Sequence, residues 1–319
     1  MNCPTCNTSA SKFGKDRNCL QRYRCLSCKK TFLEPHKRPL DDMRLSIGKA
    51  TSVIQHLEEG CSIRTTERIT GVEKRTILSL LSLAGERCEK LMENKIKGLK
   101  IKECSCDEIW DYVGMKSRTK MQKAPNAQEL GDAWCFIGME RYTKLILAWH
   151  LGQRDMDSTI AFTKKLAQAT TGNFQINTDG FPAYKDAVVH SLGAQFVDFA
   201  QIVKIYNGNP EKEKVTKYSP SKCVGCAKNA IFGNPNLRQA STSHIERQNL
   251  TVRMSMRRMT QLTNAFSKKW INLKWSYALQ FAYYNFCRIH QTVRVTPAME
   301  AGIADHIWTI EELITLVKE

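Results

Sequence analysis

Two pairs of cysteines near the N-terminus have the spacing of a metal site. The pairs are Cys3 with Cys6 and Cys25 with Cys28, and in each pair two residues separate the cysteines. A C-x-x-C turn aims both thiolates at one point, and two such turns complete a tetrahedral zinc site. Four thiolates leave no open coordination position, so we expect a structural zinc. Four free thiols are the alternative, but a segment this short buries too little apolar surface to fold without metal.

Three acidic residues far apart in the sequence are candidate ligands for a different metal. Asp107 lies inside a predicted strand, Asp179 at the end of a later strand, and Glu246 on a predicted helix. Cleaving or joining a phosphodiester requires an activated hydroxyl on one side and a stabilised leaving oxygen on the other. Two divalent ions roughly 3.5 to 4 Å apart do both. Carboxylates suit Mg²⁺ or Mn²⁺, and adjacent strands can place the two aspartates side by side.

Two further acids compete with Asp107 for the first position. Side chains alternate along a strand, so Glu108 should point to the face opposite Asp107. Asp111 should share the face of Asp107 but lie farther along the strand. We therefore predict that Asp107 is the ligand.

Glu246 stands in an arginine-rich segment, TSHIERQNLTVRMSMRR. A helix turns by about 100° per residue, which places Glu246 on one polar face with Asn249, Arg253 and Arg257. A solvated Glu–Arg pair is the simplest interpretation and would contribute a few tenths of a kcal/mol. The alternative is a functional face, on which Glu246 binds metal and Asn249 and Arg257 contact DNA.

The charge of the chain indicates a polyanionic partner. Its 319 residues include 48 Lys and Arg against 31 Asp and Glu, a net charge of +17. Phosphate contacts that release counterions favour nucleic acid as this partner, and we expect double-stranded DNA. No apolar run approaches the roughly 20 residues that span a bilayer, and no signal-type N-terminus is present. We expect a cytoplasmic, nucleoid-associated protein without a membrane partner. The cysteine-rich segment is itself basic, through Lys12, Lys15, Arg17, Arg22, Arg24, Lys29 and Lys30.

The elements predicted around these residues give a multidomain α+β protein. We expect a zinc ribbon over residues 1–36 and a helix-turn-helix DNA-binding domain over residues 37–96, with helical stretches that end at Gly60 and Gly71. A third helix follows, and its first residues would face a DNA major groove; these are Lys74, Arg75 and Thr76. A three-helix bundle without DNA contacts is the alternative.

Residues 97–304 have a different pattern, in which strands dominate. The element order β-β-β-α-β-α-β predicts a mixed sheet with helices on its faces, which is the order of an RNase H-like domain. A long loop over residues 207–241 interrupts this order, and we expect it to line the active site or contact DNA. Residues 305–319 are predicted to form a C-terminal helix.

Several other residues could do chemistry but have simpler interpretations. Cys104, Cys106, Cys223 and Cys226 could form a second metal site, although buried free thiols are the default. His290 could act as a general base, but a two-metal site requires none, so we expect a structural or DNA-contacting histidine.

Three acid-bearing blocks, DEIWDYVG, TDGFPAY and STSHIERQNL, resemble those of DDE transposases, most closely the insertion-sequence-one family of bacterial mobile elements. The block YYNFCRIHQTVRVTPAMEAGI is similar to a C-terminal block of integrase-like enzymes, and the N-terminal part also resembles this family. The resemblance implies a retroviral-integrase-like fold and a metal-binding triad of Asp107, Asp179 and Glu246. It also implies a basic catalytic residue at Arg253, DNA strand cleavage and transfer at element ends, and a homo-oligomer on DNA.

Two other functions fit the same residues. An RNase H-like nuclease or resolvase would use these acids without strand transfer. A domesticated DNA-binding regulator would use the N-terminal segments while the acid-bearing domain is idle, although the three intact acids argue against it.

Overall fold

The computed structural model describes residues 1–17, 19–34, 39–127, 129–207, 222–260 and 263–315. The chain divides into two compact units, which contain Met1–Arg44 and Leu45–Leu316. Each unit is considered by itself. The domain boundaries predicted from the sequence stay predictions.

The first unit is built on a small antiparallel sheet. Its strands are β1 (Ala10–Lys15), β2 (Gln21–Cys25) and β3 (Thr31–Leu33), in the order β1-β2-β3. Tyr23 and Phe32 stack across β2 and β3 with ring centroids 5.9 Å apart. Cys3, Cys25 and Leu40 are the buried hydrophobic residues among those described in this unit. Because this core is so small, we expect the four-cysteine cluster to provide most of the stability of the unit.

The second unit begins with three helices, α1 (Ile47–Glu58), α2 (Ile63–Thr70) and α3 (Lys74–Lys95). The Ser62 hydroxyl caps α2 by accepting from the backbone N–H of Thr65, and Gly71 ends it in the left-handed conformation. The helix α3 packs against α9 (Trp270–Ala282) at Gly85, where an added Cβ would lie 2.6 Å from Trp275 Cβ. The three helices therefore belong to the same compact unit as the sheet.

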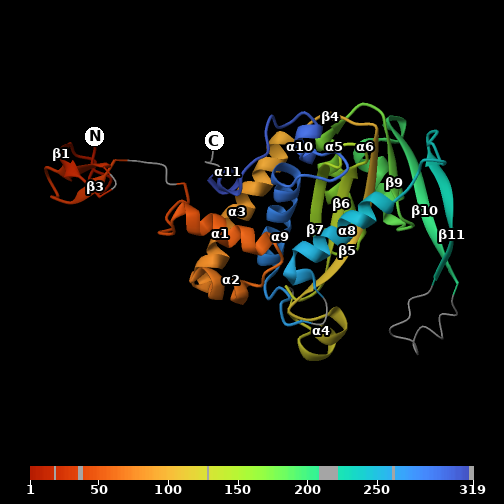
Figure 1. Cartoon of the computed structure of the whole chain (residues 1–319), viewed down its shortest axis with the longest axis horizontal. Helices are drawn as coiled ribbons and strands as arrows, with labels where there is room; N and C mark the ends of the chain where they lie inside the picture. Colours follow the sequence, from red (N-terminus) through yellow and green to blue (C-terminus); the bar gives the residue numbers. More distant parts are fainter. Residues whose placement is uncertain (18, 35–38, 128, 208–221, 261–262, 316–319) are drawn as a thin grey trace. The chain divides into compact units, whose positions relative to one another are not determined.

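The second unit contains a six-stranded mixed sheet (Figure 1). Its order is β11-β10-β9-β5-β6-β7. The central strands β5, β9 and β10 run parallel to one another, and the outer pairs are antiparallel. The strands are β5 (Glu103–Val113), β6 (Gly131–Glu140), β7 (Ile146–Gly152), β9 (Phe174–Thr178), β10 (Val197–Asn207) and β11 (Lys222–Phe232).

Helices cover both faces of this sheet. On one face lie α5 (Met156–Ala169) and α6 (Ala183–Leu192), where Phe136 of β6 contacts Phe162 and Tyr184. On the other lie α8 (Ser243–Ser255) and α9, where Trp149 of β7 contacts Phe281. The mixed sheet with flanking helices that the element order predicts is confirmed, and it is compatible with an RNase H-like fold.

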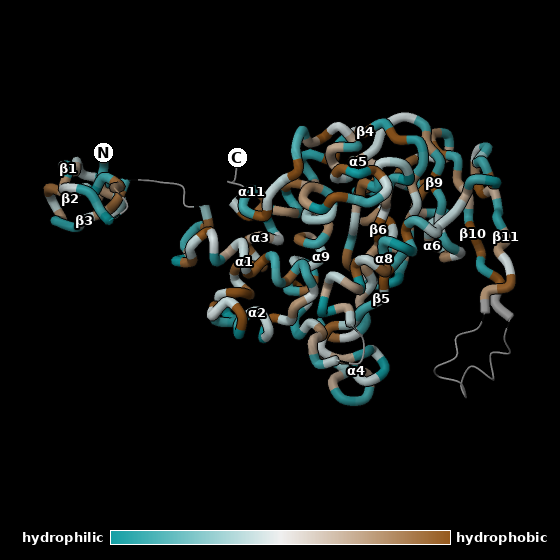
Figure 2. The backbone as a smooth tube through the Cα atoms, viewed as in Figure 1, coloured by the Kyte–Doolittle hydropathy of each residue, from teal (hydrophilic) through white to brown (hydrophobic). Residues whose placement is uncertain are grey.

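Shorter elements complete the unit. A two-stranded parallel sheet joins β4 (Leu99–Lys100) to β8 (Thr170–Thr171). None of the residues of α4 (Ser117–Lys123) is buried, and Figure 2 shows that this segment is largely hydrophilic. The remaining elements are η1 (Ala194–Phe196), η2 (Arg257–Met259), η3 (Tyr283–Cys287), α10 (Pro297–Glu300) and α11 (Ile310–Thr315). Within the described residues, none of the helices is both long and apolar enough to cross a membrane.

Two predictions meet the structure only in part. The loop predicted over residues 207–241 is wrong where it overlaps β11, which pairs with β10 over its whole length. The sequence of β11, KCVGCAKNAIF, is rich in small and polar residues, so pairing with β10 rather than intrinsic preference makes it a strand. Residues 208–221 of that loop lie outside the described residues. Within the segment predicted as a C-terminal helix, residues 305–319, the structure has α11 (Ile310–Thr315), whereas residues 305–309 are not helical and residues 316–319 lie outside the described residues.

Candidate active site

Three acids meet where β9 ends. Thr178, the last residue of β9, pairs with Cys106 of β5. Asp107 and Glu108 are the next residues of β5, and Asp179 directly follows β9. One carboxylate oxygen from each of Asp107, Glu108 and Asp179 lies within 4.8 Å of the others. We call these three residues the acid cluster. The structure thus brings Asp107 and Asp179 together, as the strand arrangement predicted.

The presence of Glu108 in the acid cluster adds a candidate ligand to those predicted from the sequence. Alternation itself holds, because Asp107 pairs with Ile137 and Glu108 with Phe136, on opposite faces of the sheet. However, the last residue pair between β5 and β9 is Cys106 with Thr178. At Asp107 and Glu108 none of the described strands therefore lies beside β5 on that side, and the two faces of the sheet are not separated there. Both carboxylates can therefore reach the space beyond the end of β9, so alternation alone does not exclude Glu108 as a ligand.

Burial and mutual repulsion set the protonation of the acid cluster. Burial raises the pKa of Asp107 to about 7, and the negative charges of Asp179 and Glu246 add to this rise. Burial followed by the charge of Asp179 raises the pKa of Glu108 to about 7. The Asp107 carboxylate accepts from the Asn249 side-chain amide at 2.7 Å and from the Glu108 backbone N–H at 2.9 Å. Hard oxygen ligands that repel one another fit a divalent cation, which would relieve the repulsion.

Glu246 lies near this site on α8 but outside the 4.8 Å group found among the described acids. Its carboxylate pairs with Lys204 of β10 at 2.6 Å and accepts from the Thr242 hydroxyl at 2.6 Å. Burial opposes ionisation, but these two hydrogen bonds hold the pKa of Glu246 below its usual value. Its charge also contributes to the raised pKa of Asp107. Glu246 is therefore an ionised carboxylate close to Asp107.

An arginine that the sequence analysis did not single out spans the acid cluster. Arg154 Nε lies 3.2 Å from Glu108 Oε2, and its Nη2 lies 3.7 Å from Asp179 Oδ2. Its guanidinium stacks 4.2 Å from the centroid of the Phe181 ring and 5.0 Å from that of Trp134. Arg154 follows β7 by two residues, and this position at a strand end is the one sequence signal that could have indicated it. Arg154 and Lys204 therefore offset part of the negative charge of the acids.

The structure places the other predicted catalytic and DNA-contacting residues in different settings. Arg253 makes no hydrogen bond to Glu246 among the described residues; instead, its charge and that of Arg258 act on Asp111. Burial nevertheless raises the pKa of Asp111 to about 7. Asn249 lies within the site through its bond to Asp107. Three predicted DNA contacts lie on the surface, with exposed side chains: Lys74, Arg75 and Arg257; Thr76 is half-buried.

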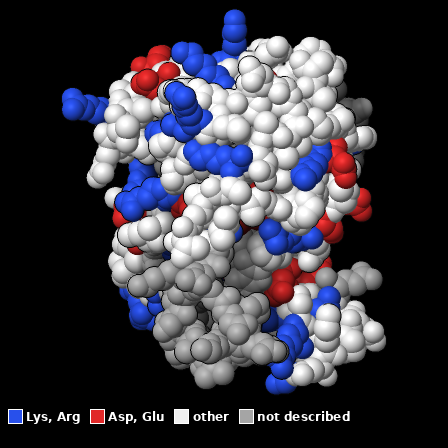
Figure 3. Space-filling view, turned by 90° about the vertical axis from the view of Figure 1, so that its right-hand side faces the viewer, with Lys and Arg blue, Asp and Glu red and all other residues white. Residues whose placement is uncertain are grey.

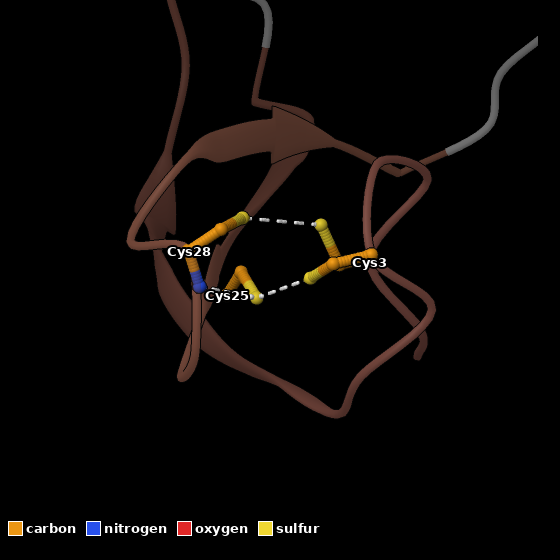
Figure 4. Close-up of side chains that lie close together, drawn as sticks. Cys3, Cys25 and Cys28 are labelled. Atoms are coloured by element: carbon orange, nitrogen blue, oxygen red, sulfur yellow. Dashed lines mark hydrogen bonds between the residues drawn. The ribbon is translucent and has the colours of Figure 1, made fainter.

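The N-terminal cysteines converge as their spacing predicted. The Sγ atoms of Cys3 and Cys28 are 3.6 Å apart, and those of Cys6 and Cys25 are 3.4 Å apart. In Figure 4 the three labelled cysteines point toward one another. A tetrahedral site with Zn–S bonds of about 2.3 Å has S–S edges of about 3.8 Å. The Thr5 backbone N–H also donates to Cys3 Sγ, which would stabilise a thiolate. The four residues fit a zinc ion.

The other cysteines do not form a comparable cluster among the described residues. Cys104 and Cys106 are buried with their Sγ atoms 3.8 Å apart, whereas Cys223 and Cys226 are exposed on β11.

Comparisons with known proteins give little further guidance. No protein-family model matches the chain, and no curated protein matches it. Among solved structures, the chain is similar to one described as the crystal structure of the Mos1 mariner paired end complex with Mn, with 11% identity and a TM-score of 0.22. The likeness covers 52% of this chain and 61% of that chain, less than two thirds of its length. It is too weak to assign a function, which must be argued from the acid cluster.

Proposed function

We propose that the protein is a DDE-type transposase that binds the ends of a mobile element and catalyses metal-dependent DNA strand cleavage and strand transfer. The observation that carries this proposal is the acid cluster at the end of β9, where burial and like charges raise the pKa values of Asp107 and Glu108. Keeping repelling carboxylates close together in a buried site is unfavourable, and such clusters are typical of functional sites. Binding of a divalent cation would account for this cluster.

In this proposal Asp107, Asp179 and Glu246 hold Mg²⁺ or Mn²⁺, and Glu108 is a fourth candidate ligand. Such ions would activate the attacking hydroxyl and stabilise the leaving oxygen. The protein orients the ligands. The Asn249 amide fixes one oxygen of Asp107, and the Phe181 backbone N–H fixes one oxygen of Asp179 at 2.9 Å. Each aspartate keeps a defined orientation, which a metal site requires.

DNA binding is proposed for the N-terminal segments and for the basic surface. A zinc ribbon and a helix-turn-helix would position the DNA, with Lys74, Arg75 and Thr76 toward the groove. Glu67 and Glu73 accept from the backbone N–H groups of Lys74 and Arg75, both at 2.9 Å. Because these amides are already satisfied, side chains must make the DNA contacts. On the face that Figure 3 shows, Lys and Arg side chains are spread widely, which favours phosphate.

The test is Asp179→Asn, assayed on DNA that carries the segments flanking the coding region, with Mg²⁺ or Mn²⁺. We expect strand cleavage and joining to fall together by roughly 100-fold or more, the size of loss typical when one transition-state contact is removed. Glu246→Gln should behave alike. DNA binding should persist, because removing an acid reduces repulsion toward phosphate.

The matched control is Asp186→Asn, an exposed acid on α6. It should cleave and join DNA like the unchanged protein. Near-normal cleavage by Asp179→Asn would contradict the proposed site. Cleavage without any joining in the unchanged protein would identify a nuclease or resolvase instead. Such an enzyme would not need to bring two DNA ends together in one oligomer.

A further inference from the structure

A second polar site lies across α8 from the acids. A pocket of about 370 Å³ is lined by four residues of α8: His244, Arg247, Gln248 and Thr251. At about 100° per residue, these four side chains point roughly opposite to Glu246 and Asn249, which face the acid cluster. The same helix therefore forms a wall of each site, and the pocket is separate from the metal ligands.

The lining of the pocket carries a net positive charge, which Glu140 and Glu103 partly offset at Lys144. Lys144, Arg247 and Arg288 line it together with two histidines, and none of its lining residues is acidic. Lys144 Nζ contacts His244 Nδ1 at 3.5 Å. Burial, and then the charges of Lys144 and Arg288, lower the pKa of His290. Cations gathered without carboxylates in a partly enclosed space favour an anionic ligand, and Arg side chains suit phosphate in particular.

Two buried polar atoms in the pocket wall have no hydrogen-bond partner among the residues that the structure describes. Gln248 and Tyr284 are 4% and 3% exposed, and within the described part of the chain neither Gln248 Nε2 nor the Tyr284 hydroxyl forms a hydrogen bond. Buried polar groups are nearly always hydrogen-bonded, so these two atoms are available to a ligand after small side-chain adjustments. They give the pocket hydrogen-bonding capacity besides its charge.

The size and the remaining walls favour more than a lone phosphate. Pockets of about 300 to 1,000 Å³ take small organic ligands. The half-buried ring of His290 packs edge-on against the buried ring of Tyr284 with centroids 6.2 Å apart, and Ile289, which is 54% exposed, adds apolar surface. Aromatic and apolar walls of this kind suit the flat face of a nucleobase.

We infer that this pocket binds a single nucleotide, with the phosphate on Arg247 and Arg288 and the base against Ile289 and the ring of His290. The nucleotide is either free or an unpaired residue of a DNA strand. The inference goes beyond strand transfer, since the pocket shares no residue with the acid cluster and would bind a nucleotide even if the acids were inactive.

The experiment measures binding of 5′-dAMP to the full chain by calorimetry in the absence of divalent metal. Deoxyadenosine and inorganic phosphate are the comparison probes, and each should bind at least tenfold more weakly than 5′-dAMP. Arg247→Gln should weaken 5′-dAMP binding at least tenfold, and because Arg247 is exposed the variant should fold. Tyr284→Phe, which removes only the hydroxyl, should weaken it severalfold. Arg118→Gln, an exposed arginine of α4 outside the pocket, is the matched control and should bind normally.

A 5′-phosphorylated pentathymidylate distinguishes the two sources. Binding at least tenfold tighter than that of 5′-dAMP, with the same loss in Arg247→Gln, supports an unpaired nucleotide of a strand; equal binding supports a free nucleotide. Absence of 5′-dAMP binding, phosphate binding as tight as that of 5′-dAMP, or unchanged binding by Arg247→Gln would each overturn the inference. Asp179→Asn should bind 5′-dAMP normally. The binding measurement therefore tests the pocket independently of the proposed catalytic function.

Discussion

At the scale of single residues, each acid of the site has a cationic or amide partner. Asp107 accepts from Asn249, Arg154 spans Glu108 and Asp179, and Lys204 pairs with Glu246. Arg154 and Lys204 therefore occupy carboxylate oxygens for which a divalent ion would compete. The two basic side chains let the protein fold around its acids without metal, and a metal must displace at least part of these contacts.

The raised pKa values predict how metal binding depends on pH. A carboxyl with a pKa of about 7 is largely protonated at pH 6 and must lose its proton before it binds a cation. For each carboxyl that must lose a proton, Mn²⁺ affinity should therefore increase about fivefold between pH 6 and pH 7 and about tenfold between pH 6 and pH 8, and then level off. Calorimetric titration with Mn²⁺ in this range measures the slope.

Variants show which carboxyl is responsible for that slope. Glu108→Gln should reduce it if Glu108 is a ligand, and Asp186→Asn should leave it unchanged. If the Mn²⁺ affinity does not change between pH 6 and pH 8, neither Asp107 nor Glu108 binds the ion.

At the scale of elements, the sequence contained the strand ends but not their register. Asp107 and Asp179 could be paired because a strand pattern ends at Asp179 and another contains Asp107. Glu108 could not be placed, because its position depends on where β9 stops beside β5. Arg154 and Lys204 escaped notice because ion pairs between distant elements leave no local pattern. The nucleotide pocket was missed for the same reason, since β6, α8 and η3 all contribute to it.

The contact between α3 and α9 predicts the effect of one methyl group. In Gly85→Ala the new Cβ would lie 2.6 Å from Trp275 Cβ and 2.8 Å from the Trp275 carbonyl oxygen. Two helix backbones must then separate, so we expect a loss of about 1–3 kcal/mol in the free energy of unfolding. Thermal unfolding followed by circular dichroism measures it.

Gly48→Ala is the control for this substitution. Gly48 also lies in a helix, α1, but an added Cβ would meet no atom within 4 Å. Its stability should be unchanged or higher by up to about 1 kcal/mol, because alanine favours helix. Equal effects of the two substitutions would mean that α3 and α9 do not pack closely at Gly85.

At the scale of the whole molecule, the two compact units divide the proposed tasks. The unit Leu45–Leu316 contains the acid cluster and the pocket, whereas Met1–Arg44 contains the four-cysteine cluster and many basic residues. In the latter unit Arg22 and Arg24 stack over the ring of Phe13, at 5.6 and 5.3 Å from its centroid. Their order therefore depends on the fold that the cysteines hold.

This dependence predicts that zinc loss weakens DNA binding and leaves the larger unit folded. The unchanged protein should contain about one zinc per chain by elemental analysis, because four thiolates close one site. Cys28→Ser should lose most of this zinc, whereas Cys19→Ser, which changes an exposed cysteine of the same unit outside the cluster, should keep it.

The log of DNA affinity should fall linearly with the log of salt concentration, with a slope of about −0.9 per phosphate contact. In Cys28→Ser that slope should become shallower, in proportion to the number of phosphate contacts that the first unit makes. The temperature of the main thermal unfolding transition, which belongs to the larger unit, should not change. An unchanged slope in a zinc-free protein would show that the first unit does not hold phosphate, and the basic surface of the larger unit would then account for DNA binding alone.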